Sequence, residues 1–220
     1  KQKNTAPDIS CTAGQMPRLL GLAQASKIYR NQKNIDASKF SVNGNEVAWG
    51  TIGNASTSEG MFFETINAGG VLQVPMVISI WDDGYGISVP KKYQTTKESI
   101  SDVLAGFQRT QSQKGWEIIK VKGWSYAKLC LAFERAARIA RTEHVPVLVH
   151  VEDITQPQGH STSGSHERYK TEERLAWAQQ YDCLVQMKKW ILDSEIAKEK
   201  ELEQINTEAL KEVREAKKTE

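Results

Sequence analysis

Two short polar segments of this chain have the residue types that bind a phosphate group and a metal ion. The first runs from Gly53 to Gly60 (GNASTSEG), between a predicted strand and a predicted helix. Small residues let the backbone turn sharply and approach a ligand, and the unpaired N–H groups at a helix N-terminus attract anions. The alternative is an ordinary helix cap by one of the hydroxyl residues at 56–58, with Glu59 as an acid in the first turn.

The second segment runs from Trp81 to Ser88 (WDDGYGIS) and follows the next predicted strand. Ligands of open parallel sheets bind beyond the carboxyl ends of the strands, so we expect Asn54 and Asp83 to lie near each other. Carboxylate, amide and main-chain oxygens are the ligands that Mg²⁺ prefers, together with phosphate oxygens. Asp-Gly is also a common turn pair. Only the two segments together, in this order around a helix, indicate a site.

The hydrophobic pattern places these segments within an alternation of strands and helices. Helices are predicted at Met16–Arg30, Glu59–Leu72, Ile100–Phe107 and Ser125–Arg141, and strands at Glu46–Ile52, Met76–Trp81, Glu117–Val121 and Val145–Val151. Strand, helix and strand in succession form a unit whose two strands lie parallel and side by side. We therefore predict an α/β fold with a doubly wound, mostly parallel sheet and helices on both faces.

The pattern changes after the last predicted strand. Residues 152–170 form a long polar loop that holds His160 and His166, and loops of this length in compact domains are often functional. Residues 172–192 read as helical, and apolar residues at 202, 205, 209, 213 and 216 make residues 193–220 an amphipathic helix. We predict an α/β domain over residues 1–170 and a helical extension over 171–220 packed on it. A partner-binding helix is the alternative for the last segment.

Composition argues against several classes of function. The 220 residues include 29 Lys and Arg and 27 Asp and Glu, so a net charge of +2 gives no general attraction to nucleic acid or to an anionic membrane. No apolar run approaches the roughly 18 to 20 residues of a membrane-spanning helix. Cys11, Cys130 and Cys183 lie far apart and form no CxxC pair, which indicates neither a disulfide framework nor a thiolate zinc site. From this use of cysteine we expect a reducing compartment, and we expect it to be the cytoplasm because no targeting segment is recognisable.

The two polar segments also carry a family resemblance. Gly53-Asn54-Ala55, followed 29 residues after Asn54 by Asp83, resembles the thiamine diphosphate motif that begins with G-D-G or G-E-G and ends in N-N. Residues 54–60 and 83–90 are similar to the α subunit of 2-oxo acid dehydrogenase E1 components. The branched-chain (2-oxoisovalerate) type is the most similar, on the segments His160-Ser161-Thr162-Ser163, Tyr169-Lys170 and Gln15-Met16-Pro17. The resemblance covers residues 9–192 and implies the thiamine diphosphate-binding fold.

The resemblance implies thiamine diphosphate and Mg²⁺ as cofactors and gives the polar residues roles in binding them. Asn54 and Asp83 would supply side-chain oxygens to Mg²⁺, and Tyr85 would supply its main-chain oxygen. Ala55 and Ser56 would donate backbone N–H groups to the diphosphate.

Four further positions match residues that the family places around the rings and the reacting carbon. Ser10, Thr12 and Ile87 would lie against the thiazolium and the aminopyrimidine. His160 would face the diphosphate and the reacting carbon, as the catalytic acid–base or as a hydrogen-bond donor. A solvent-exposed loop histidine is the alternative for His160.

The chain also departs from the family pattern. The usual motif has an acid at its first metal position and an amide at its second, and here Asn54 and Asp83 exchange these types. The formal charge is unchanged, so we predict that metal binding is retained, although Ala55 replaces the second glycine of the motif and tightens the turn. Two arginines that members often place against the phosphates are Trp81 and Gln156 here, which should weaken binding or move the charge compensation elsewhere.

The implied function is oxidative decarboxylation of a 2-oxo acid, with transfer of the acyl group to a lipoyl-bearing E2 partner. The implied assembly is an α₂β₂ or fused dimer, in which an E1 β subunit or β half holds the aminopyrimidine. We expect this chain to be the diphosphate-binding part of a larger E1 that does not turn over substrate alone. The alternatives are another thiamine enzyme, of the acetoin dehydrogenase or transketolase-like type, and a non-catalytic assembly domain with a degenerate cofactor site.

Overall fold

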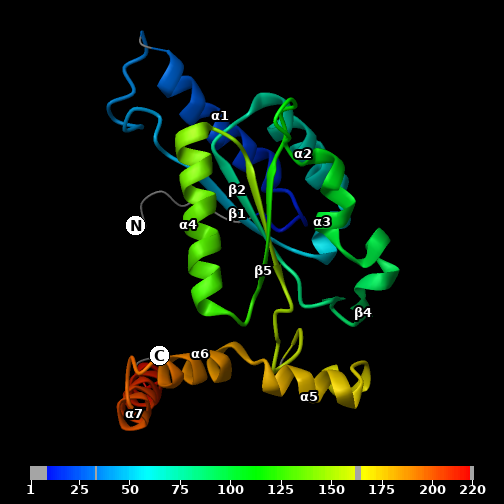
Figure 1. The fold of residues 1–220 in the computed structure, drawn as a ribbon, viewed down its shortest axis with the longest axis vertical. Helices are drawn as coiled ribbons and strands as arrows, with labels where there is room; N and C mark the ends of the chain where they lie inside the picture. The colour runs from blue at the N-terminus through cyan, green and yellow to red at the C-terminus, as the bar shows by residue number, and fades with distance from the viewer. Residues whose placement is uncertain (1–8, 33, 162–164, 219–220) are drawn as a thin grey trace.

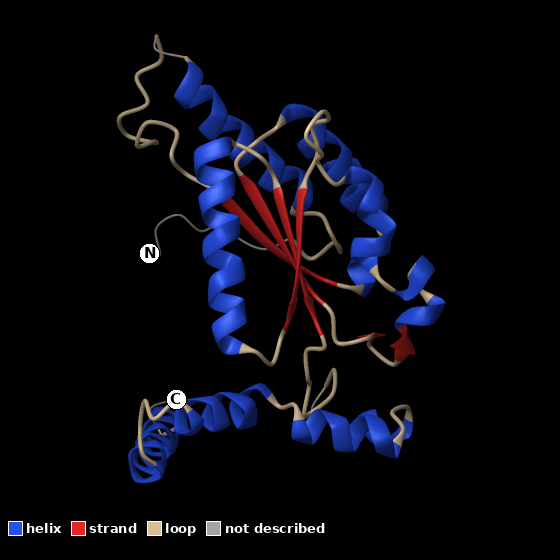
Figure 2. Cartoon of the chain, viewed as in Figure 1, coloured by secondary structure: helices blue, strands red, loops and turns tan. Residues whose placement is uncertain are grey.

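A parallel sheet with helices on both faces forms the centre of the molecule in the computed structural model, which describes residues 9–32, 34–161 and 165–218 (Figures 1 and 2). In this described part of the chain the main sheet has the order β1-β2-β6-β5. Its strands are β1 (Ala48–Gly53), β2 (Met76–Trp81), β6 (Val147–Glu152) and β5 (Glu117–Lys122), and all three pairings are parallel. The predicted fold class is confirmed.

Helices cover the two faces of the sheet unequally. α1 (Met16–Asn31), α2 (Gly60–Leu72) and α3 (Ile100–Val103) pack on one face, and α4 (Tyr126–Glu143) packs on the other (Figure 1). Successive side chains of a strand point to opposite faces, and in β2 Ile78 and Ile80 enter the first core while Val77 enters the second. Because β2 and β6 are central and covered on both sides, their sequences are almost continuously apolar.

Most of the predicted boundaries differ from the observed ones by one or two residues, and four differences are larger. The amphipathic helix predicted over 193–220 begins only at Glu199, as α7 (Glu199–Ala216). The predicted helix over 100–107 divides into α3 and a 3₁₀ turn, Leu104–Phe107. The predicted helix over 172–192 breaks into α5 (Glu172–Gln180) and α6 (Cys183–Asp193), because the Asp182 carboxylate caps α6 by accepting hydrogen bonds from two backbone N–H groups at 2.9 and 3.2 Å. The hairpin of β3 (Tyr85–Gly86) and β4 (Val89–Pro90) was not predicted, since strands this short carry no alternating pattern.

Short 3₁₀ turns occupy several connections. They are Ala55–Ser58 after β1, Lys91–Tyr93 and Thr96–Glu98 before α3, and Ser165–Arg168 before α5.

The C-terminal helices lie beyond the carboxyl end of the sheet (Figure 1). Aromatic contacts join them to the start of α4: the ring centroids of Trp124 and Tyr181 are 5.1 Å apart, and those of Tyr126 and Trp190 are 6.0 Å apart. α7 (Glu199–Ala216) has no buried residue. The structure therefore does not bury the apolar stripe of α7 on the α/β domain, and the division of the chain at residue 170 stays a prediction. No helix in the described ranges has the length and apolar content needed to cross a membrane.

Candidate functional site

A cavity of about 660 Å³ lies at the carboxyl ends of β1 and β2. Gly53 pairs with Trp81 in the parallel register, so the two polar segments leave the sheet at the same edge, as the sequence predicted. Residues ahead of α1 and part of the loop after β6 complete the lining. The lining residues are Ile9, Cys11, Thr12, Ala13, Gln15, Thr51, Ile52, Gly53, Asn54, Ala55, Ser56, Glu59, Trp81, Asp83, Tyr85, Gly86, Ile87, Gln94, Gln156 and His160.

Asn54 begins the turn between β1 and α2 and is 5% exposed. Its backbone N–H donates to the carbonyl oxygen of Trp81 (3.1 Å), and its carbonyl oxygen accepts from the hydroxyl of Thr57 (2.6 Å). These bonds fix the backbone, whereas the side-chain nitrogen is buried without a hydrogen-bond partner in the described structure. A buried polar atom without a partner is costly, and an oxygen-rich ligand in the cavity would satisfy it.

The hydroxyl-cap interpretation of this turn is wrong. α2 begins after Glu59, and no side chain caps it with a hydrogen bond. The hydroxyl of Thr57 instead bonds within the turn, to the Asn54 carbonyl oxygen. The helix α2 therefore begins directly after the lining residue Glu59 without a side-chain cap, and uncapped N–H groups at a helix N-terminus suit an anion.

Asp83 follows β2 and lines the same cavity. One of its carboxylate oxygens accepts a hydrogen bond from the Tyr85 N–H (3.0 Å), and its carbonyl oxygen accepts one from the guanidinium of Arg174 (2.8 Å). Burial raises the pKa of the Asp83 carboxyl, and the negative charge of Asp82 adds to the rise. The Tyr85 N–H and the charge of Lys170 oppose it but do not outweigh it. A bound cation would relieve this cost by stabilising the ionised form.

The β3–β4 hairpin presents a strained residue to the cavity. Ile87 has a φ of 59° although it is β-branched, and its side chain is 64% exposed. Branched residues rarely adopt the left-handed region, and such outliers gather at functional sites. Tyr85 precedes it on β3, with its ring 5.7 Å from the ring of Tyr169 and 5.3 Å from the amine of Lys170.

The remaining predicted site residues fall in or beside the cavity. Thr12 and His160 line it, and so do Trp81 and Gln156, the two positions at which the resemblance implies arginines. Ser10 is exposed and lies between the lining residues Ile9 and Cys11, without lining the cavity itself. Thr162 and Ser163, from the segment that follows His160, lie outside the described residues.

Comparison with known proteins identifies the family. The model of the family described as "Dehydrogenase E1 component" matches residues 1–219, almost the whole chain. This chain belongs to the dehydrogenase E1 component family.

The relatives are α subunits. The chain is 28% identical to the pyruvate dehydrogenase E1 component subunit alpha of Acholeplasma laidlawii over 196 residues, which are 88% of this chain and 50% of that protein. It is 26% identical to the mitochondrial 2-oxoisovalerate dehydrogenase subunit alpha 1 of Arabidopsis thaliana over 206 residues, 93% of this chain and 39% of that protein. It is 30% identical to the 3-methyl-2-oxobutanoate dehydrogenase subunit alpha of Mycobacterium tuberculosis over 129 residues, 58% of this chain and 33% of that protein. This E1 α-type chain thus spans half or less of the length of these relatives.

Membership of the E1 family implies thiamine diphosphate as the cofactor, and the cavity fits its diphosphate end. The fit rests on the unpartnered Asn54 amide nitrogen, the uncapped start of α2, and the Asp83 carboxyl, whose pKa burial raises. In the described residues, no group of three or more His, Cys, Asp or Glu side chains is arranged so that it could hold a metal ion by itself. A cation in this E1 chain would therefore depend on few carboxylates and on oxygen atoms brought by the ligand, which is the way Mg²⁺ is usually held.

The charge of the cavity is unusual for an anion site. Asp83 and Glu59 line it, but no Lys or Arg of the described ranges does. Two cations near the cavity contact the turn at Asp83 without lining the cavity. The guanidinium of Arg174 donates to the Asp83 carbonyl oxygen. The amine of Lys170 lies beside the Tyr85 ring and interacts with the charge of Asp83. Arg174 is not among the site residues predicted from the sequence. The one sequence feature that could have indicated it is its position four residues after Lys170.

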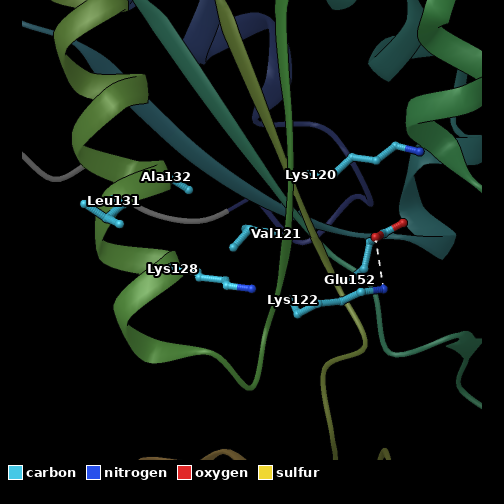
Figure 3. A pocket seen from close by; sticks show the side chains of 7 residues that line it. All are labelled: Lys120, Val121, Lys122, Lys128, Leu131, Ala132 and Glu152. Atoms are coloured by element: carbon cyan, nitrogen blue, oxygen red, sulfur yellow. Dashed lines mark hydrogen bonds and ion pairs between the residues drawn. The ribbon is translucent and has the colours of Figure 1, made fainter. Parts of the chain in front are cut away.

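A second hollow of about 350 Å³ lies between α4 and β5, away from this cavity (Figure 3). Three lysines line it, and Lys122 pairs with Glu152 at 3.3 Å. Lys120 pairs with Asp102 at 2.6 Å. Lys128 is the third lysine that lines the hollow. Two of the three charges are thus already compensated, and this hollow is a weaker anion site than the number of lysines suggests.

Proposed function

We propose that this chain forms the diphosphate-binding half of a thiamine diphosphate- and Mg²⁺-dependent E1 component. The enzyme would decarboxylate a 2-oxo acid oxidatively and pass the acyl group to the lipoyl arm of an E2 partner. The observation that carries the proposal is the meeting of Asn54 and Asp83 at one cavity, at the carboxyl ends of adjacent parallel strands. Family membership and the α-subunit relatives support the same assignment.

Three groups would hold Mg²⁺. These are the side-chain oxygen of Asn54, the carboxylate of Asp83 and the main-chain oxygen of Tyr85, and the phosphate oxygens would complete an octahedral set. The exchange of acid and amide leaves one carboxylate and one amide at the two motif positions. The formal charge offered to the metal is therefore the one that the motif normally supplies.

The diphosphate would rest on the backbone N–H groups of Ala55 and Ser56, near the N-terminus of α2. Because no Lys or Arg of the described structure lines the cavity, Mg²⁺ would supply most of the positive charge that the diphosphate needs. A strict dependence of cofactor binding on Mg²⁺ follows.

When bound, thiamine diphosphate supplies a nucleophilic thiazolium carbon and an electron sink for decarboxylation. Thr12, Ile87 and Ser10 would orient the ring system. The strained backbone at Ile87 directs a bulky side chain at the cavity, where it would restrict the conformation of the bound rings. His160 would donate a hydrogen bond or transfer a proton at its ring nitrogen, beside the reacting carbon.

The proposed partners are an E1 β subunit or β half, which would hold the aminopyrimidine, and a lipoyl-bearing E2, in an α₂β₂ or fused dimeric assembly. Among the substrates we favour a branched-chain 2-oxo acid, because of the similarity around His160 and Tyr169. The relatives include both pyruvate and branched-chain enzymes. An assay with several 2-oxo acids and lipoamide would distinguish them, and activity without lipoamide would favour a transketolase-like enzyme.

The first test is calorimetric titration of thiamine diphosphate into the complete protein, with and without Mg²⁺. We expect saturable binding only with Mg²⁺, and its loss in the Asp83→Ala variant. Glu64→Ala, which removes an exposed acid from α2 outside the cavity, is the matched control and should bind normally. Unaltered binding by Asp83→Ala would overturn the metal assignment.

The second candidate function is a non-catalytic assembly domain. The specific observation in its favour is the lack of a lysine or arginine among the cavity residues that the structure describes, with Trp81 and Gln156 in their place. A folded, assembled protein that binds no cofactor at any Mg²⁺ concentration would favour this function over the enzymatic one.

A further inference from the structure

A hydrogen-bond network of polar side chains, most of them buried, lies directly behind the turn that carries Asp83. Asp82 is 2% exposed and His150, on β6, is 0% exposed. The ring Nε2 of His150 is 3.0 Å from a carboxylate oxygen of Asp82, and its Nδ1 is 2.8 Å from the hydroxyl of Ser101 at the start of α3. The amine of Lys91 lies 3.1 Å from the same Asp82 oxygen. None of these four residues lines the cavity.

In this network, the hydrogen bond between His150 and Asp82 has a defined direction. A carboxylate can only accept, so Nε2–H of His150 donates to Asp82, while Nδ1 on the other side of the ring hydrogen-bonds with the Ser101 hydroxyl. The second oxygen of Asp82 accepts from the Gly84 N–H at 2.8 Å. Asp82 also bonds through its main chain, since its N–H donates to Val151 (2.9 Å) and its carbonyl oxygen accepts from the N–H of Ile154 (3.0 Å).

Three hydrogen-bond donors surround the buried carboxylate of Asp82. His150 and Lys91 contact one of its oxygens, and the Gly84 N–H contacts the other. Asp82 is thus a compensated buried anion, anchored to β6 and to the turn after β4.

The arrangement Ser101–His150–Asp82 has the residue types of a hydrolytic triad, but it does not serve that chemistry. Ser101 is 3% exposed and lines neither of the two cavities described above, so its hydroxyl is not accessible to a substrate carbonyl. The buried network is therefore a structural support, and the element it supports is the turn at residues 82–85.

We propose that His150 and Lys91 are positioning residues that act through Asp82 to fix the turn in which Asp83 faces the cavity. This inference rests on the proposed function, in which Asp83 binds Mg²⁺. Asp82 and Asp83 are consecutive, so anchoring the first carboxylate inward sets the backbone from which the second points outward. Residues that orient a ligating group in this way commonly change metal affinity by about 10- to 100-fold when they are removed.

The experiment measures the Mg²⁺ concentration that gives half-maximal binding of thiamine diphosphate to the complete protein, by calorimetry. His150→Leu should raise this concentration about tenfold. His150→Gln should restore binding, because the glutamine amide can still donate to Asp82. Leu148→Ala, a buried change on the same strand, controls for stability: it should lower the melting temperature and leave the Mg²⁺ requirement unchanged.

A second pair of variants keeps the test decisive if His150→Leu does not fold. Lys91→Met removes the exposed end of the network and should raise the Mg²⁺ requirement several-fold, whereas Lys92→Met, its exposed neighbour, should not. If Asp83→Ala abolishes binding while the His150 and Lys91 variants match their controls, the positioning role is overturned and the metal site stands. If Asp83→Ala binds normally, the proposed metal site fails first, and this inference fails with it.

Discussion

Two consecutive aspartates at the end of β2 show how local environment separates identical side chains. Hydrogen bonds from His150 and Gly84 and the charge of Lys91 lower the pKa of Asp82, whereas burial beside that negative charge raises the pKa of Asp83. The Asp82 carboxylate is stabilised as an anion by groups of the protein, whereas the Asp83 carboxylate would be stabilised as an anion by a bound cation. A metal site needs a carboxylate in this second state, since a ligand already fully paired would gain little from the ion.

Gln156 offers a gain-of-function test of the charge argument. It lines the cavity that has no Lys or Arg among its described residues, so Gln156→Arg would add a charge-assisted donor for the diphosphate. We expect about tenfold tighter binding of thiamine diphosphate and a weaker dependence on Mg²⁺, both measured by calorimetry. Gln158→Arg, on the same loop but outside the lining, is the control. Equal gains in both variants would point to a general electrostatic effect and contradict a specific contact.

Ile87 offers a test of stored strain. Its φ of 59° costs a β-branched residue about 1–2 kcal/mol, and asparagine tolerates this conformation. Ile87→Asn should therefore raise the free energy of unfolding by about 1 kcal/mol while weakening cofactor binding. Ile87→Val keeps both the branch and the strain and should change neither by much. Chemical denaturation and calorimetry on the same samples check the two effects. A variant that loses both stability and binding would show that Ile87 is a packing residue.

At the scale of elements, the Glu46 carboxylate helps to hold the connection between α1 and β1. Glu46 accepts hydrogen bonds from the Ser41 hydroxyl (2.8 Å) and from the backbone N–H of Val42. Burial works to raise the pKa of Glu46, but these bonds outweigh it and hold that pKa below its usual value. The stabilisation from an acid with a lowered pKa is fully present above its ordinary pKa and is lost as the pH falls through the lower, folded-state value.

Glu46→Gln should therefore lose about 1 kcal/mol of stability at pH 7, and the difference from the unsubstituted protein should shrink below pH 4.5. Urea denaturation at pH 7 and at pH 3.5 measures both differences. If the difference in the free energy of unfolding is the same at both pH values, the hydrogen bonds of Glu46 contribute to stability and its charge does not.

The strand and helix pattern predicted the elements of the sheet, because covered parallel strands and amphipathic helices leave a periodic signal. It also placed Asn54 and Asp83 together, since the register of β1 and β2 brings their carboxyl ends to one edge. It could not find the His150–Asp82 contact. His150 lies in an apolar strand 68 residues after Asp82, and no local pattern encodes a bond across β2 and β6. The break at Asp182 was missed because the apolar residues on both sides keep helical spacing.

At the scale of the whole molecule, the candidate site draws on both parts of the chain. The α/β sheet supplies Asn54 and Asp83, and α5 supplies Arg174, which donates to the Asp83 carbonyl oxygen. Aromatic contacts through Trp124 and Tyr181 hold the helical extension against the carboxyl end of the sheet. The extension therefore supports the candidate metal turn, even though its helices add nothing to the two cores that cover the sheet.

α7 contributes differently, because its apolar stripe is left exposed. Ile205 and Val213 are 61% and 67% exposed, and a side chain that loses no burial on unfolding contributes little to stability. Replacing both residues by glutamine should change the free energy of unfolding of this chain by less than about 0.5 kcal/mol. Leu148→Ala, in the core, should cost about 2–5 kcal/mol in the same urea titration. A loss above about 1.5 kcal/mol from the α7 substitutions would mean that the helix packs on the α/β domain, as its amphipathic sequence predicts. Unchanged stability with weaker assembly of the complete protein would instead assign the stripe to a partner chain.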